Sequence, residues 1–190
     1  MINRIIKDKR FMAVIDEIVH SFPGETNVPI GNYTSQWLGN FYLTPIDNFV
    51  KHSLRIGAYV RYCDDFLLFS NDKAKLGKAK GLIEKELERL KLEYSKAEVF
   101  GVRQGVDFCG YRHFKRYVLL RKSTASRLKR RAAFYERNKR DANEAVLAGS
   151  FASANGLLRH CCSFNLRKSL LRRNPVCRPF LCLDKTGARV

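Results

Sequence analysis

The sequence predicts an α+β protein with an antiparallel sheet. Three observations favour this class: apolar residues recur at helical spacing in several separate segments, two short β-prone runs flank a turn around Asp64, and further β-prone runs precede a last set of helical segments. Helices and strands that are segregated along the chain in this way are typical of α+β folds.

The N-terminal part is expected to be helical on either side of a polar loop. Ile5 to Val19 places its apolar residues on one broad helical face, and a proline–glycine pair then marks a break. A polar stretch from Val28 to Gln36 follows, and a second helical run extends from Trp37 to Val50. Because Pro45 lies inside that run, we expect it to kink the helix or to start a new one.

A hairpin followed by an amphipathic helix is expected in the middle of the chain. The segments AYVRY, from Ala58, and FLLFS, from Phe66, are β-prone and flank a turn-prone Cys-Asp-Asp, which places Asp64 and Asp65 at the tip. Asp72 is predicted to be the N-cap of the next helix. That helix carries its apolar residues on one face, at Leu76, Ala79, Ile83, Leu87 and Leu90.

Strands and then basic helices are expected in the rest of the chain. Short strands are predicted over Leu92–Phe100, Val106–Phe114 and Tyr117–Arg121. Ser123 or Thr124 is predicted to cap a basic helix that continues to Leu147, and a helical pattern also covers Leu157–Leu171. With a change of subdomain expected near Leu120, the predicted regions are residues 1–119, a basic helical region over 120–173, and a tail without clear periodicity over 174–190.

Positive charge is concentrated in the second half of the chain. Lys and Arg number 36 and Asp and Glu 18, for a net charge of +18. Residues 1–100 carry 15 basic and 13 acidic side chains, net +2, whereas residues 101–190 carry 21 and 5, net +16. A field of this size attracts polyanions and holds them by counterion release. Nucleic acid is therefore the expected partner, with an anionic membrane surface or a merely soluble basic protein as the alternatives.

Composition argues against several classes of protein. Hydrophobic residues make up 45% of the chain and aromatic residues 12%, so a packed core is expected and wholesale disorder is not. The apolar runs are too short to cross a bilayer, and charges interrupt the N-terminal apolar stretch, which argues against a secretory signal. We therefore expect no membrane partner, a cytoplasmic location and reduced cysteines. A zinc site in the C-terminal part is disfavoured, because the spacing of its candidate ligands fits no Cys-x-x-Cys pair. These candidates are His160, Cys161, Cys162, Cys177 and Cys182.

Two adjacent carboxylates at the tip of an apolar hairpin need a physical explanation. Asp64 and Asp65 repel each other unless a cation lies beside them. Magnesium binds through one or two carboxylates together with water and substrate phosphates, and paired metal ions stabilise both oxygens of an in-line phosphoryl displacement. The alternative is an ordinary hairpin turn, in which Asp is common.

The surrounding pattern is more specific than the dipeptide. Tyr62-Cys63-Asp64-Asp65, within YVRYCDDFLLFSND, resembles the YxDD signature of reverse transcriptases. PIGNYTSQWLGNFYLTPIDNFV, LEYSKAEVF, VDFCGYRHF and YVLLRKSTASRLKRR resemble, in order, that family's pocket loop with a palm helix, a lysine-bearing strand, a hairpin near the primer end and the start of the thumb. The resemblance covers Ile5 to Leu171 and implies a partial right-hand polymerase palm, an antiparallel sheet backed by helices, plus a helical basic thumb.

The pocket loop suggests a subfamily. Ile30-Gly31-Asn32-Tyr33-Thr34-Ser35-Gln36 resembles the variant found in reverse transcriptases of diversity-generating retroelements. In that family an aliphatic first residue is associated with error-prone copying, because Ile30 packs against a nucleotide where a glutamine would hydrogen-bond. The resemblance assigns nucleotide binding to Ile30, Gly31, Ser35, Gln36 and Tyr62. Without it, the segment reads as a polar turn that caps a helix at Thr34 or Ser35.

The resemblance also assigns catalytic and binding roles. Asp64 and Asp65 would bind Mg²⁺, with Mn²⁺ as a substitute, and Lys96 would neutralise or protonate the leaving pyrophosphate, unless it is an ordinary exposed lysine. Gly110 and Tyr111 would shape the hairpin that holds the primer strand. Backbone phosphates would be gripped by a basic group, which is otherwise a solvated helix face: Arg121, Lys122, Arg127, Lys129, Arg130 and Arg131.

The resemblance lacks one part of the family's site. Its polymerases hold a further metal-binding Asp on an earlier palm strand, and Asp8, Asp16 and Asp47 are not matched to it. We therefore expect RNA-directed DNA polymerase activity by family, with this chain alone weak or inactive. The alternatives are a catalytically dead nucleic-acid-binding fragment and a subunit of a split polymerase. Expected partners are template RNA, primer DNA, deoxynucleotides, a small basic accessory protein and a complementary N-terminal polymerase fragment.

Overall fold

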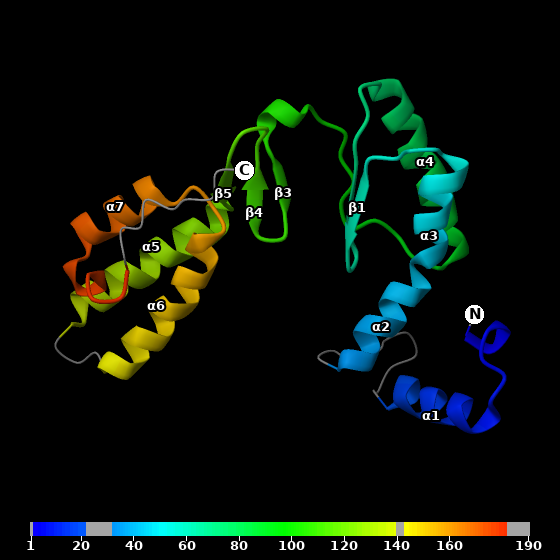
Figure 1. Cartoon of the computed structure of the whole chain (residues 1–190), viewed down its shortest axis with the longest axis horizontal. Helices are drawn as coiled ribbons and strands as arrows, with labels where there is room; N and C mark the ends of the chain where they lie inside the picture. Colours follow the sequence, from blue (N-terminus) through cyan, green and yellow to red (C-terminus); the bar gives the residue numbers. More distant parts are fainter. Residues whose placement is uncertain (1, 22–31, 140–142, 182–190) are drawn as a thin grey trace. The chain divides into compact units, whose positions relative to one another are not determined.

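The computed structural model describes residues 2–21, 32–139 and 143–181, which form two compact units over residues 1–99 and 100–190 (Figure 1). Each unit combines helices with a small antiparallel sheet, so the predicted α+β class is confirmed. The strands form two separate sheets within the described residues, of two and three strands, rather than one. The division at Val99 and Phe100 lies upstream of the change that the sequence suggests near Leu120.

The first unit begins with helices and continues through a hairpin to a long helix. Its elements are η1 (Ile2–Arg4), α1 (Lys9–His20), α2 (Tyr33–Tyr42), α3 (Thr44–Asn48), the π-helical turn η2 (Phe49–Ser53), β1 (Tyr59–Tyr62), β2 (Asp65–Leu68) and α4 (Lys73–Arg89). Pro45 lies in the first turn of α3, where a missing N–H costs nothing, so the chain starts a new helix as predicted. Asp72 caps α4, and its carboxylate accepts hydrogen bonds from the amides of Ala74 and Lys75.

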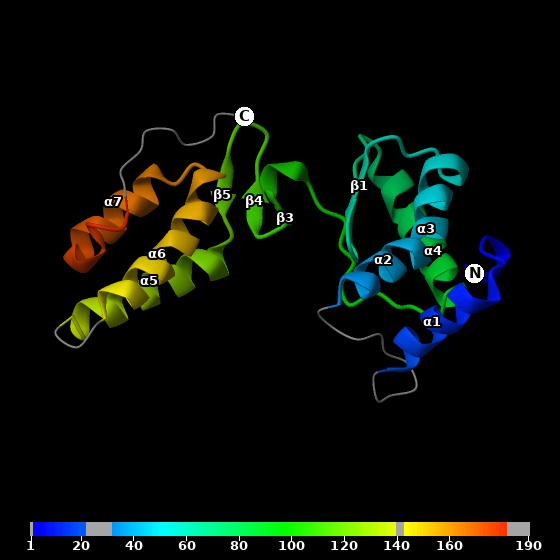
Figure 2. The same cartoon turned by 60° about the horizontal axis from the view of Figure 1, so that its bottom comes forward.

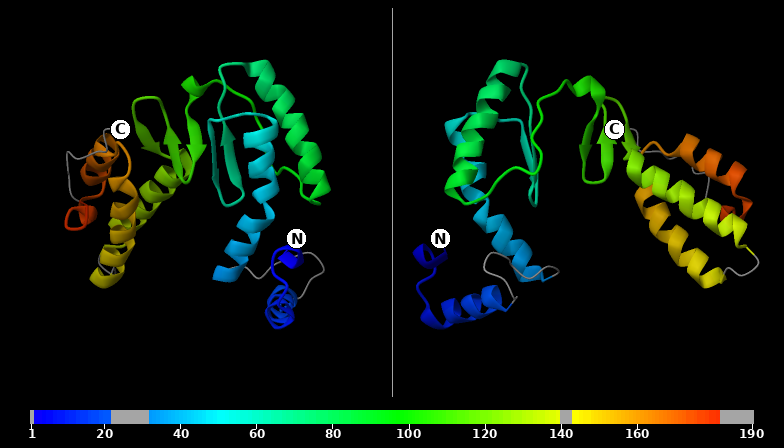
Figure 3. Two further views of the ribbon diagram at one scale, coloured as in Figure 1. Left: turned by 45° about the vertical axis from the view of Figure 1, so that its right-hand side comes forward. Right: turned by 180° about the vertical axis from the view of Figure 1, so that it is seen from behind.

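The core of the first unit lies between α3, α4 and the hairpin, which Figure 3 shows side by side. The predicted face of α4 is confirmed at its centre, because Ala79, Ile83 and Leu87 are buried there. They pack with Ile46 of α3 and, at the rim, with side chains of both strands. One face of the hairpin thus packs on the helices, and Asp64 lies beyond this contact, at the tip.

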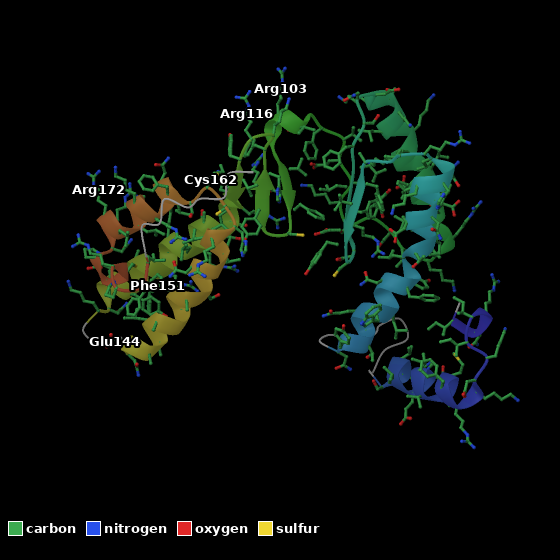
Figure 4. The ribbon with its side chains drawn as sticks, viewed as in Figure 1. Arg103, Arg116, Glu144, Phe151, Cys162 and Arg172 are labelled. Atoms are coloured by element: carbon green, nitrogen blue, oxygen red, sulfur yellow. The ribbon has the colours of Figure 1, made fainter. Side chains whose placement is uncertain are left out.

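The second unit places a sheet at one end of three helices. Its elements are η3 (Val102–Gln104), β3 (Val106–Phe108), β4 (Tyr111–His113), β5 (Val118–Leu120), α5 (Lys122–Arg137), α6 (Glu144–Arg159), α7 (Phe164–Arg173) and η4 (Pro175–Cys177). Figure 2 shows α5 alongside α6 and α7. Phe151 of α6 is fully buried between them (Figure 4), and it stacks on Phe180.

Several predicted boundaries in this half of the chain are wrong. Leu92–Phe100 forms no strand, because its β-prone residues find no partner strand to complete a ladder. Val106–Phe114 is a hairpin of two strands, since the chain reverses at Cys109 and Gly110. The residue at the N-cap of α5 is Arg121, rather than Ser123 or Thr124.

The last helical segments are also divided differently. The basic helix predicted to reach Leu147 ends at Arg137, and α6 starts again after Asn143, whose side chain accepts a hydrogen bond from the amide of Ala145. The pattern over Leu157–Leu171 spans the end of α6 and most of α7, and a break that includes the buried Ser163 separates the two.

Candidate functional site

The Tyr-Cys-Asp-Asp segment forms a two-residue β-turn. Tyr62 and Asp65 are the last paired residues of β1 and β2, so Cys63 and Asp64 make up the tip. The expectation that both aspartates lie at the tip is therefore wrong for Asp65, which is the first residue of β2. Cys63 has a φ of 52°, which a residue with a side chain adopts only at a cost. A positive φ at the first loop residue is shared by the two turn types, I′ and II′, whose twist suits a hairpin.

The carboxylates of the turn are available to a ligand. Asp64 and Asp65 are exposed, and neither accepts a hydrogen bond nor forms an ion pair with any residue that the structure describes. Two neighbouring hard oxygen donors fit Mg²⁺, which takes one or two carboxylates and completes its shell with water and phosphate. Tyr62, predicted to lie near the nucleotide, is also exposed, with 62% of its surface accessible.

A partly buried ion pair lies next to this turn, and the sequence did not reveal it. The side chain of Arg61 meets Asp47 of α3 through two hydrogen bonds, Nε to Oδ1 at 2.8 Å and Nη2 to Oδ2 at 2.6 Å. Nη1 donates to Oδ1 of Asn40 at 2.8 Å and to the carbonyl oxygen of Cys63 at 2.8 Å. Tyr59 adds a hydrogen bond from its hydroxyl to Asp47 at 2.7 Å. The carbonyl at the tip is thus tied to α2 and α3.

The electrostatics of this cluster favour the ionised Asp47. Burial alone would raise the pKa of Asp47, but hydrogen bonds from Arg61 and Tyr59 and the charges of Arg61 and Lys51 together lower it. Burial, and then the hydrogen bond and charge of Asp47, raise the pKa of the Tyr59 hydroxyl. A half-buried arginine on a strand indicates that some acidic partner is needed. The sequence does not indicate that this partner is Asp47.

The remaining nucleotide-pocket residues are only partly described. Ile30 and Gly31 lie outside the described residues. Ser35 and Gln36 lie in the first half of α2, whose N-cap residue is Asn32, so the alternative of a cap at Thr34 or Ser35 is wrong. The hydroxyl of Ser35 is buried and makes no hydrogen bond in the described structure.

Lys96 lies on an irregular segment rather than on a strand. Its Nζ lies 3.4 Å from a carboxylate oxygen of Glu98, and both side chains are largely exposed. Exposed pairs of this kind contribute under about 1 kcal/mol, so Lys96 can exchange Glu98 for another anion.

Gly110 and Tyr111 have structural roles in the second unit. Cys109 and Gly110 join β3 to β4 with φ values of 48° and 84°, as a type I′ turn requires. Tyr111, the first residue of β4, donates a hydrogen bond from its hydroxyl to the carbonyl of Leu157 on α6 at 3.1 Å. Burial, followed by the nearby Cys161, raises the pKa of Tyr111. Both residues therefore shape this hairpin and attach it to the helices.

The basic group on α5 divides into exposed and half-buried members. Lys122, Arg127, Lys129 and Arg130 are exposed, and no carboxylate of the described residues lies within ion-pairing distance of them. The guanidinium of Arg131 is half-buried; it donates to the carbonyl of Ser150 at 2.8 Å and lies 5.9 Å from the ring centre of Phe151. Arg121, at the N-cap, is also half-buried, and its Nε makes no hydrogen bond in the described structure. The exposed four are thus free to meet phosphates.

The second unit carries further basic side chains outside the predicted group. Figure 4 shows Arg103 and Arg116 projecting from one end of the three-stranded sheet and Arg172 projecting from α7. Because Phe100 is uncharged, the boundary between the units coincides with the step in charge, and the second unit carries net +16 against +2 for the first. The charge of the chain is therefore a property of one folded unit.

In the parts of the chain that the structure describes, no group of three or more His, Cys, Asp or Glu side chains is arranged to hold a metal ion, and no helix is long and apolar enough to span a bilayer. No protein-family model matches the sequence, and no curated protein matches it.

Proposed function

We propose that this chain is a reverse-transcriptase portion of the diversity-generating retroelement type, in which Asp64 and Asp65 bind a divalent cation and the basic unit holds a primer on an RNA template. The observation that carries the proposal is the pair of exposed, unpartnered carboxylates on a rigidly packed hairpin, within a Tyr-x-Asp-Asp pattern. The reaction is nucleotidyl transfer to a primer 3′-hydroxyl, and error-prone copying is the expected consequence of Ile30.

The residues of the first unit would bind and orient the reactants. Bound Mg²⁺ would supply the positive charge that stabilises the attacking and leaving oxygens. Asp64 would provide the main carboxylate ligand, and Asp65 would assist it. Tyr62 presents an exposed ring beside these carboxylates in the sequence, suited to packing near the primer end. Lys96 is free to leave its exposed pairing with Glu98 and to neutralise pyrophosphate.

The second unit would supply affinity without base selectivity. Its exposed lysines and arginines suit contacts with backbone phosphates, which position a nucleic acid but carry no sequence information. The carboxylate pair has no third acidic partner among the described residues, so we expect slow extension by the chain alone.

The test is primer extension on a homopolymeric RNA template with Mg²⁺ or Mn²⁺, using the whole chain. Wild type is expected to extend slowly, Asp64→Asn to lose extension, and Asp16→Asn to behave as wild type. Asp16 is a matched control because it is exposed and, among the described residues, its carboxylate pairs only with His20, at 3.5 Å. Extension that survives in Asp64→Asn would contradict the proposal.

The second candidate is a nucleic-acid-binding protein without catalysis, and the lack of a third described carboxylate beside Asp64 favours it. The same experiment separates the two, if binding of the primer–template is measured in parallel. Salt-dependent binding with no extension by wild type supports the second candidate. Absence of both refutes both.

A further inference from the structure

We infer that Arg61 is a positioning residue that holds the carbonyl of Cys63, and with it the turn that presents Asp64 and Asp65. The inference rests on the proposed function, because it assigns to the arginine the task of fixing two cation ligands. It does not make Arg61 a catalytic residue, since the hydrogen bonds of its guanidinium go to protein atoms.

The geometry uses the full donor capacity of the guanidinium. A planar guanidinium has five N–H donors in a fixed fork. Asp47 takes two of them, Asn40 takes one at its side-chain oxygen and one at its carbonyl oxygen at 3.4 Å, and the tip carbonyl of Cys63 takes the last at 2.8 Å. Both sides of the ion pair are largely buried, with 13% of the Arg61 side chain and 24% of the Asp47 side chain exposed. Four hydrogen bonds therefore fix the guanidinium, and the fixed guanidinium in turn holds the carbonyl of Cys63.

The position of that fifth contact is what matters for the turn. The carbonyl of Cys63 belongs to the peptide that leads into Asp64, so its direction sets the plane from which that side chain departs. Cys63 is strained, at a φ of 52°, and such a residue persists only where its surroundings hold it. Arg61 lies two residues before Cys63, so its long side chain reaches the tip carbonyl from within the adjoining strand.

Charge gives a second reason why an ion pair is used here. Asp47 neutralises Arg61, so the support beneath the turn carries no net charge and does not compete with a cation. An unpaired arginine at the same place would repel a divalent ion and attract the two carboxylates to itself. The pair therefore fixes the turn while leaving the negative charge of Asp64 and Asp65 available.

Substituting lysine separates positioning from charge. Arg61→Lys keeps the positive charge and a bond to Asp47, but a single ammonium cannot serve Asp47, Asn40 and Cys63 in the same fixed plane. Loss of an outer support of a metal site costs at least about tenfold in affinity. We expect Arg61→Lys to weaken Mn²⁺ binding about tenfold while the chain stays folded. The matched control is Arg89→Lys, because Arg89 pairs with Glu86 at 2.6 Å within α4, and we expect its affinity to equal that of wild type.

Two measurements on the whole chain complete the test. Mn²⁺ binding is measured by the electron paramagnetic resonance signal of the free ion, with Asp64→Asn as the variant that removes the site. Amide hydrogen exchange of the segment over residues 59–68 reports the turn directly, and we expect it to be faster in Arg61→Lys than in Arg89→Lys. If Arg61→Lys unfolds the chain, Asn40→Ala removes one contact that holds the guanidinium while the Arg61–Asp47 pair stays intact, and we expect a smaller loss of affinity.

The outcomes are distinguishable. Weaker Mn²⁺ binding with faster exchange at the turn supports the inference. A folded Arg61→Lys chain with wild-type affinity and wild-type exchange overturns it. If wild type binds no Mn²⁺, the proposed function of the carboxylates fails, and exchange at the turn alone decides whether Arg61 holds it.

Discussion

Nucleic-acid binding by the second unit should rest on the exposed face of α5, and two residues give the sharpest test. Lys129 and Arg130 are neighbours on that face, both are exposed, and neither pairs with a described carboxylate. Replacing both by glutamine removes two charges from solvent-facing positions, where substitutions change stability by at most about 0.5 kcal/mol. The double variant should therefore remain folded and bind more weakly.

The size of the loss follows from counterion release. Each phosphate neutralised on a single strand contributes about 0.7 to the slope of log affinity against log salt, so the pair contributes roughly 1.4. Extrapolated from about 1 M salt, where this contribution vanishes, the loss at about 0.1 M is roughly 25-fold. The assay is fluorescence anisotropy of a labelled single-stranded RNA, titrated at several salt concentrations.

The control removes the same number of charges from the other unit. Lys78 and Lys85 are exposed on α4, so Lys78→Gln with Lys85→Gln changes the net charge of the chain equally. We expect its salt slope to stay within about 0.3 of wild type. Equal reductions in the two double variants would refute the reasoning, because they would show that net charge rather than a local surface binds RNA. An unchanged slope in the α5 variant would refute it as well.

Three further predictions concern stability. Gly110→Ala should destabilise the chain by about 1–2 kcal/mol in urea unfolding, because its φ of 84° is unfavourable for alanine. The new methyl group meets nothing within 4 Å, so the loss reports the backbone alone. Its control is Gly156→Ala, which is equally open but lies within α6 and should stabilise the chain by up to about 1 kcal/mol. Asp47→Asn should cost about 2 kcal/mol at neutral pH. Because folding lowers the pKa of Asp47 from 3.8, this contribution is complete above that value and is lost as the pH falls through the folded-state pKa. The free energies of unfolding of wild type and variant, measured with urea, should therefore converge below the folded-state pKa. Arg167→Met should cost about 2–4 kcal/mol in chemical denaturation, because Arg167 is buried at 4% exposure and donates hydrogen bonds to the side-chain oxygens of Ser163 and Asn155, each of which would lose a donor.

Features that depend on neighbouring residues could be predicted from the sequence. Asp72 follows a strand and precedes a helical pattern, and it caps α4 as predicted. Pro45 starts a new helix because its ring fixes φ and leaves it without a backbone N–H, which only the first turn of a helix tolerates. The hairpin was predicted because β-prone runs lie on both sides of a turn-prone segment, although its register, which puts Asp65 on the strand, depends on the loop conformation.

Features that depend on distant partners could not be predicted. Leu92–Phe100 has the composition of a strand, but a strand exists only where another strand pairs with it. The break between α5 and α6 has local signals in Asn138 and Asn143, but helical periodicity alone does not detect them. The pairing of Arg61 with Asp47 joins a strand to a helix and has no local signal of any kind.

The other aspartates of the first unit show why the carboxylate pair is singled out. Asp8 is the N-cap of α1, and its carboxylate accepts hydrogen bonds from the amides of Arg10 and Phe11. Asp16 lies one turn from His20 on the exposed surface of the same helix. Each of these carboxylates already contacts a group on its own helix, and no sequence pattern places either of them in the cation site.

Asp47 requires a stronger argument, because the same network that ties it to Arg61 also reaches the turn. One of its oxygens accepts hydrogen bonds from Tyr59 and Arg61, and the other accepts the shortest bond of the network, at 2.6 Å. A cation on Asp47 would have to break the ion pair and leave a largely buried guanidinium without its counter-charge, which is unfavourable. A cation bound at the turn must therefore complete its shell from Asp64, Asp65, water and phosphate oxygens. On this argument, its affinity should rise when a nucleotide is present, while Asp47 acts only through Arg61.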